Sequence, residues 1–71
     1  MIPIYPMKVY LFDENGKYTE PIILDNESQL NGVGTRTILQ SHIKQGLEVR
    51  ITDPFDNCLF HADKGKIIFP I

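Results

Sequence analysis

Turn-forming residues interrupt this chain at short, regular intervals, and this spacing constrains the fold more than any other feature. Asn15-Gly16, Gly46, the segment DPFDN at 53–57 and the segment DKGK at 63–66 each favour a reversal of the chain. The residues between these signals form short apolar runs. Such a pattern predicts short strands joined by tight turns.

One stretch has the spacing of a helix instead of a strand. Leu39 and Ile43 lie four residues apart, as do Ile38 and His42, and together they give one apolar stripe within residues 35–45. Gly46 follows directly and favours the left-handed conformation in which many helices end. We therefore expect one helix, at residues 35–45.

The predicted element order is ββαβββ, an α+β domain with four to five strands in an antiparallel or mixed sheet. The expected strands are 8–13, 18–24, 47–52, 58–62 and 66–69. Pro21 cannot donate a ladder hydrogen bond, so the second strand should lie at a sheet edge or carry a bulge around that residue. Residues 1–6 should form an extended arm and residues 7–71 one domain. This order resembles that of β-grasp domains, in topology alone, and a small curled barrel is a further alternative.

Apolar residues fall on both sides of the predicted strands, although a single helix covers only one side. Strand alternation assigns to the helix side Val9, Leu11, Val49, Ile51, Cys58 and Phe60. It assigns to the opposite side Tyr10, Phe12, Leu59, His61 and Ile68. This second face needs cover from the N-terminal arm, from curling of the sheet or from another chain, and we predict that it binds a partner.

Charge and length limit the kinds of partner. Seven Lys and Arg against nine Asp and Glu give a net charge of -2, which argues against a nucleic-acid-binding face. The first six residues lack the basic segment and long apolar core of a signal peptide or membrane span, so we expect a cytoplasmic protein without membrane contact.

A chain of 71 residues with one cysteine has no internal disulfide. Small domains of this kind often gain stability by self-association, which makes a homodimer one expected form.

The segment NGVGTRT at 31–37 supports two interpretations. Its residues Gly32, Gly34, Thr35, Arg36 and Thr37 precede or open the predicted helix, where backbone N–H groups and a cation favour an anion. The phosphate-loop and dinucleotide motifs are both incomplete here. The structural interpretation makes Thr37 the N-cap, with Gln40 completing a capping box, and leaves the glycines to redirect the chain.

Catalytic and metal-binding residues are few. Cys58 and His61 are three positions apart, so a regular strand points them to opposite faces, and Cys58 is expected to be a core thiol. His42 flanks the apolar stripe of the helix, where a packed histidine is the usual role. The carboxylates fall mostly in turns, where Asp caps backbone groups. We therefore expect no enzyme activity, no metal and no cofactor.

The sequence thus predicts a small non-catalytic module that binds another protein or itself through its apolar sheet face. The alternative is a module that binds a small ligand or nucleotide anion at Gly32–Thr37. These two functions use different surfaces and can be separated by substitution.

Overall fold

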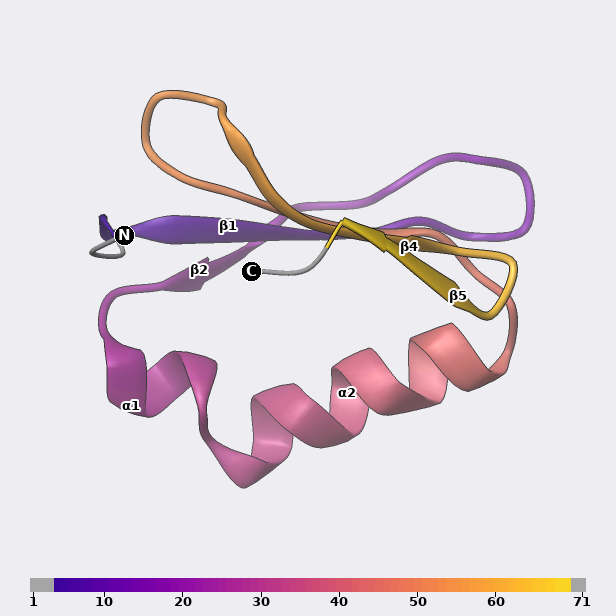
Figure 1. Cartoon of the computed structure of the whole chain (residues 1–71), viewed down its shortest axis with the longest axis horizontal. Helices are drawn as coiled ribbons and strands as arrows, with labels where there is room; N and C mark the ends of the chain where they lie inside the picture. The colour runs from indigo at the N-terminus through magenta and orange to yellow at the C-terminus, as the bar shows by residue number, and fades with distance from the viewer. Residues whose placement is uncertain (1–3, 70–71) are drawn as a thin grey trace.

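Two helices cover one face of a five-stranded sheet in the computed structural model, which describes residues 4–69 (Figure 1). The elements in chain order are β1 (Met7–Leu11), β2 (Ile22–Leu24), α1 (Glu27–Leu30), α2 (Val33–Lys44), β3 (Val49–Thr52), β4 (Cys58–Asp63) and β5 (Lys66–Phe69). The α+β class predicted from the sequence is confirmed. The additional element is α1, a single helical turn in the segment expected to be a polar loop.

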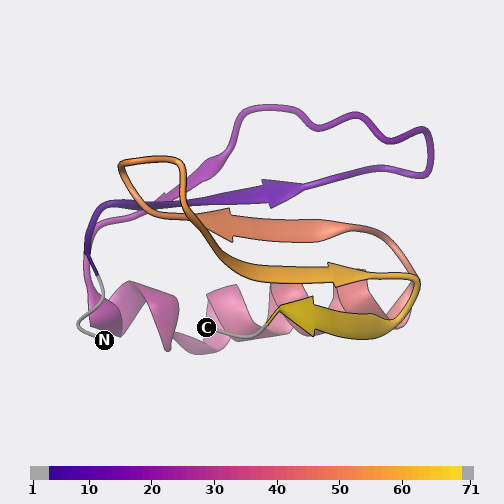
Figure 2. The same cartoon turned by 45° about the horizontal axis from the view of Figure 1, so that its top comes forward.

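The strands lie in the order β2-β1-β3-β4-β5, and every neighbouring pair is antiparallel (Figure 2). The sheet is open, with β2 and β5 at its edges, so the curled-barrel alternative is wrong and the β-grasp alternative is not confirmed. The edge position predicted from Pro21 is confirmed. Regular pairing of β2 is limited to Ile22–Leu24, and the earlier part of the hairpin holds only an isolated bridge between Phe12 and Tyr18.

Local turn chemistry behaves as the sequence predicts. Gly16 has a φ of 77°, which glycine adopts without strain in the turn between β1 and β2. The Asp13 carboxylate accepts hydrogen bonds from the backbone N–H groups of Asn15 and Lys17 at 2.8 and 3.0 Å. In the turn between β3 and β4, Asp53 accepts from the backbone of Phe55 and from Asn57 in the same way. These carboxylates stabilise turns.

The main helix begins earlier than predicted. Gly32 is the N-cap of α2, so Thr37 lies inside the helix and its assignment as N-cap is wrong. The reason is α1, which the Asn26 side chain caps by accepting from the Gln29 backbone at 3.0 Å. A Cβ atom on Gly32 would lie 3.2 Å from the Ser28 carbonyl oxygen. Glycine therefore permits the close passage of the chain from α1 into α2.

The core lies between the sheet and the helices. One cluster of buried side chains comes from β1, β2 and β3, and its members are Met7, Val9, Leu24, Val49 and Ile51. Ala62 of β4 is also fully buried. Leu39 and Ile43 of α2 pack against them, as the helical spacing predicts. Tyr5 also packs against this cluster, so the described part of the N-terminal arm contributes to the helix side of the sheet. Residues 1–3 lie outside the described residues.

A bulge in β4 overturns two assignments of side chains to faces. Ile51 pairs with Phe60, but the next residue, Thr52, pairs with Cys58, so β4 contains one extra residue, Leu59. The extra residue turns Cys58 to the side away from the helices, where it is exposed, and Leu59 packs against the core. The expectations of a buried Cys58 and of Leu59 on the opposite face are therefore wrong.

Candidate binding face

The sheet surface opposite the helices, called the outer face below, holds a cluster of aromatic and charged side chains. Its centre is a cross-strand row in which Tyr10 of β1 pairs with Arg50 of β3, and Arg50 pairs with His61 of β4. Directly paired residues project to the same side of a sheet. Val9 and Ile51, one position away, point into the core, which fixes this row on the outer face.

Three aromatic rings form one side of the cluster. The Tyr18 ring stands edge-on to Tyr10, with centroids 4.9 Å apart, and edge-on to Phe12, with centroids 5.2 Å apart. Edge-to-face contacts of this kind are favourable because the positive ring edge meets the negative ring face. The Tyr18 residue is still 51% exposed. The hairpin between β1 and β2 therefore holds an aromatic ring in a fixed orientation at the surface.

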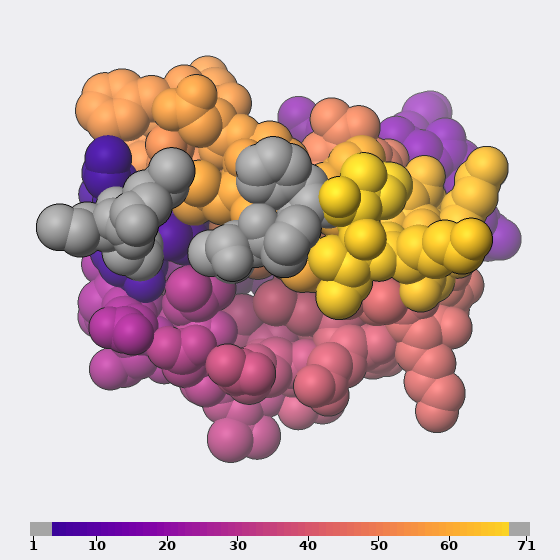
Figure 3. All heavy atoms as spheres, viewed as in Figure 1, coloured from indigo at the N-terminus to yellow at the C-terminus, as the bar shows by residue number. Residues whose placement is uncertain are grey.

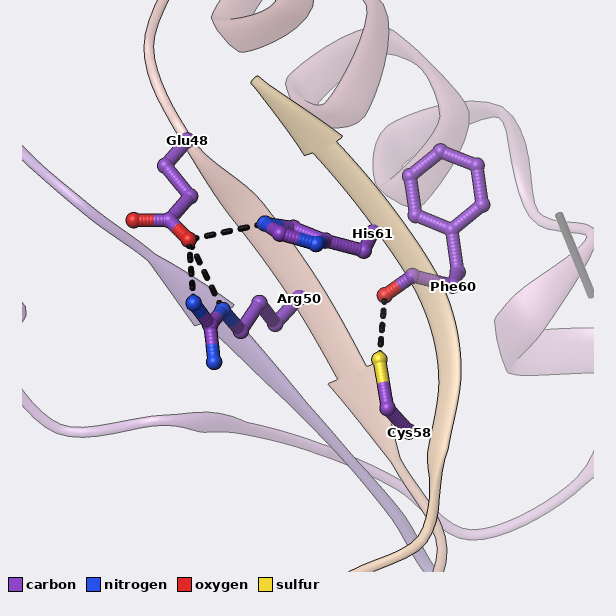
Figure 4. A network of polar contacts seen from close by, with 5 residues as sticks. All are labelled: Glu48, Arg50, Cys58, Phe60 and His61. Carbon is purple, nitrogen blue, oxygen red and sulfur yellow. Dashed lines mark hydrogen bonds and ion pairs between the residues drawn. The ribbon is translucent and has the colours of Figure 1, made fainter. Parts of the chain in front are cut away.

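On the other side of the cluster, the Glu48 carboxylate binds both the Arg50 guanidinium and the His61 ring. Its Oε2 atom accepts from Arg50 Nε at 2.8 Å and lies 2.7 Å from Arg50 Nη2. His61 Nε2 lies 2.8 Å from the same oxygen, and because a carboxylate accepts, Nε2 is the donor (Figure 4). The Phe60 ring points away from this trio towards the helices (Figure 4). One carboxylate oxygen thus fixes side chains from two strands.

Arg50 connects the charged and the aromatic parts. Its Cζ atom lies 5.8 Å from the centroid of the Phe12 ring, within the range of a cation–π contact. About half of the Arg50 side chain, 49%, is exposed, against 22% for the Glu48 side chain. The guanidinium therefore keeps a free surface while its position is fixed from two sides.

The electrostatics favour an ionised carboxylate in this cluster. Burial raises the pKa of Glu48, but the hydrogen bonds donated by Arg50 and His61, together with the Arg50 charge, outweigh it. The pKa of Glu48 consequently lies below its ordinary value of 4.5. Glu48 therefore stays charged at neutral pH and keeps its partners in place.

The predicted partner-binding residues are only partly brought together. Tyr10, Phe12 and His61 lie in the cluster. Leu59 belongs to the core, and Ile68 is the extra residue of a second bulge, in β5, where it is 60% exposed at the sheet edge. The prediction left out Tyr18, Glu48 and Arg50. Glu48 and Arg50 are two residues apart, a spacing that places both on one face of a strand and could have been read from the sequence.

The residues of the predicted anion loop lie at the start of α2. Gly32 is the N-cap, and Gly34, Thr35, Arg36 and Thr37 occupy the first turns of the helix. The Arg36 guanidinium donates through Nη2 to Asn31 Oδ1 at 3.1 Å. This arrangement holds Arg36 beside the helix N-terminus. Anion binding at this loop stays a prediction.

The histidines and the cysteine make local contacts. His42 Nε2 donates to the Phe12 carbonyl oxygen at 2.7 Å and links α2 to the end of β1. Because of the β4 bulge, Cys58 and His61 share the outer face, contrary to the expectation of opposite faces, and the Cys58 thiol donates to the Phe60 carbonyl oxygen at 3.4 Å. Within residues 4–69, no three His, Cys, Asp or Glu side chains lie close enough to hold a metal ion.

Among the described residues, none of the helices combines the length and the hydropathy needed to cross a bilayer. The cytoplasmic location stays a prediction. The chain matches no protein-family model, no curated protein and no solved structure.

Proposed function

We propose that this protein is a non-catalytic module that self-associates through the outer face of its sheet. The observation that carries the proposal is the cluster of Tyr10, Tyr18, Phe12 and Arg50 on the face that no helix covers. Tyr and Arg are the residue types that most often supply binding energy at protein interfaces, and Phe is enriched there. Their concentration on one small surface supports docking there.

Preorganisation of the cluster adds to this support. Binding loses free energy when long side chains have to be ordered at the interface. Arg50 is already held by Glu48 and by the Phe12 ring, and Tyr18 is held between two other rings. A partner that meets these side chains therefore orders fewer of them.

A second copy of the chain is the partner that the charges favour. The outer face carries the cation Arg50 and the anion Glu48 in contact with each other. Across a twofold axis each copy presents the same patch to the other, so a patch with both signs can meet itself without repulsion. A small domain also gains the stability that its limited core does not supply. A different protein with the same chemistry is the alternative partner.

The test is the solution mass by light scattering over a concentration series from micromolar to millimolar. We expect a reversible dimer in the wild type and a shift towards monomer of about tenfold or more in concentration for Arg50→Glu, because the reversal places like charges at the interface. Lys44→Glu, an equal charge reversal at an exposed position of α2, is the matched control and should leave the dimer unchanged. A strictly monomeric wild type, or equal effects of both substitutions, would contradict self-association through this face.

A further inference from the structure

The helix side of the sheet contains a groove that is separate from the outer face. It has a volume of about 410 Å³ and lies between α2 and the β3–β5 part of the sheet. Its apolar walls are formed by Leu30, Leu39, Ile43, Ile51, Phe60 and Ile67. Figure 3 shows the seam between the atoms of α2 and those of β5 on the side that faces the viewer.

The groove exists because the helices cover the sheet unevenly. Along one cross-strand row, Val49 and Ala62 are fully buried, but their neighbour Ile67 on β5 is 59% exposed. The floor reaches the core, since Ile51 is only 1% exposed and also lines the groove. The groove therefore lies directly over the buried core, with its open side at β5.

Among residues 4–69, Arg36 is the only charged side chain that lines the groove. Its guanidinium is held by the neutral Asn31 side chain at 3.1 Å, and within residues 4–69 it forms no ion pair with a carboxylate. Asn31 and Gln40 are the other polar groups of the lining. The groove thus combines apolar walls with one cation whose charge no described residue balances.

We propose that this groove binds a small amphiphilic monocarboxylate, with its hydrocarbon part against the apolar walls and its carboxylate on Arg36. Small-molecule sites in proteins have volumes of about 300–1,000 Å³ and apolar walls with a few convergent polar groups. The guanidinium is planar and forms paired, charge-assisted hydrogen bonds with a carboxylate. A single unbalanced cation matches a ligand with a single negative charge. This site does not depend on the outer face or on self-association.

The experiment follows backbone amide NMR signals of the wild-type chain during titration with decanoate below its micelle concentration. We expect saturable shifts confined to the first three turns of α2, to Phe60 and to Ile67. Decyltrimethylammonium, with the same chain and the opposite charge, should bind at least about tenfold more weakly, because it meets a like charge at Arg36. Acetate, which lacks the chain, should cause no saturable shift at these positions.

Two substitutions that each remove one positive charge from α2 test whether Arg36 binds the carboxylate. Arg36→Gln should weaken decanoate binding about tenfold or more, whereas Lys44→Gln, on the same helix but outside the groove lining, should not change it. Equal binding of the two amphiphiles, shifts centred on Tyr10 and His61, or unchanged affinity in Arg36→Gln would each overturn the proposal. Dilution of the protein alone, if it moves the same groove signals, would show that a second copy occupies the groove and would also overturn it.

Discussion

The two faces of the sheet differ in how their polar groups are partnered. On the outer face, Glu48 binds Arg50 and His61, and Arg50 also contacts the Phe12 ring. On the helix side, Arg36 lines an apolar groove, donates to the Asn31 amide oxygen and forms no ion pair within residues 4–69. The outer face therefore offers an ordered surface of balanced charge to a large partner. The groove offers a concave surface of unbalanced charge to a small one.

The largest expected effect comes from the residue that links the core to the groove. Ile51→Ala removes a side chain that is 1% exposed and should lower the free energy of unfolding by about 2–5 kcal/mol, through lost burial and an enlarged cavity. Ile68→Ala, the same type of truncation at a side chain 60% exposed, should change it by less than about 1 kcal/mol. Urea denaturation measures both. Equal losses would mean that the burial of these two side chains is not as described.

A stabilising change is expected on the outer face. The Thr52 hydroxyl oxygen is buried and has no hydrogen-bond partner among the described residues. Thr52→Val replaces this hydroxyl by a methyl group of similar shape in strand β3 and should raise the free energy of unfolding by about 1 kcal/mol. Thr19→Val at an exposed site is the control. A loss of stability in Thr52→Val would indicate that water or another group satisfies the hydroxyl.

The ion-pair cluster should make a smaller, pH-dependent contribution. Glu48→Gln should lower the free energy of unfolding at neutral pH by about 0.5–1 kcal/mol, because the carboxylate that holds Arg50 and His61 loses its charge. The lowered pKa of Glu48 means that this stability is present above the ordinary value of 4.5 and is lost as the pH falls through the folded-state pKa.

Denaturation of wild type and Glu48→Gln over this range checks the sign. The difference between the two proteins should shrink on acidification, and a difference that grows would contradict the depressed pKa. Asp53 contributes equally to acid sensitivity in both proteins, because both keep the hydrogen bond from the Asn57 side chain that lowers the pKa of Asp53 below its ordinary value of 3.8. Glu14→Gln, the same substitution in an exposed turn, is the matched control.

The smallest effect on folding is expected at the groove. Arg36→Gln should change the free energy of unfolding by less than about 0.5 kcal/mol, because Arg36 is exposed and its hydrogen bond to Asn31 lies at the surface. Thermal denaturation without ligand measures this value. A loss as large as that of Glu48→Gln would show that Arg36 is a structural residue. The contrast between the two faces would then disappear.

Local chemistry explains which parts of the fold the sequence predicted. The turn at Asn15-Gly16 and the helix end before Gly46 follow from backbone preferences of single residues, and both occur as expected. The start of α2 was misplaced by two residues because Asn26 caps a short helix that the predicted loop did not include. The candidate site was predicted only in part. Tyr10, Phe12 and His61 follow from alternation along regular strands.

Leu59 and Cys58 show why alternation alone fails. A strand sequence carries a period of two, but it does not reveal where the partner strand forces an extra residue into the ladder. The bulge between β3 and β4 reverses the faces of both residues, and the bulge in β5 places Ile68 outside the regular pattern. Neighbouring strands fix these positions, so no local property of β4 or β5 predicts them.

The sequence by itself determined the class of the domain, the positions of its turns and part of its apolar core, including Val9, Val49 and Ile51. These depend on interactions between residues close along the chain and on the burial of apolar area, which local patterns encode. The tertiary structure decided the strand order and the register. It alone brought His61 into contact with Glu48 and placed Arg36 beside an apolar groove, because both arrangements join segments that only pairing and packing bring into contact.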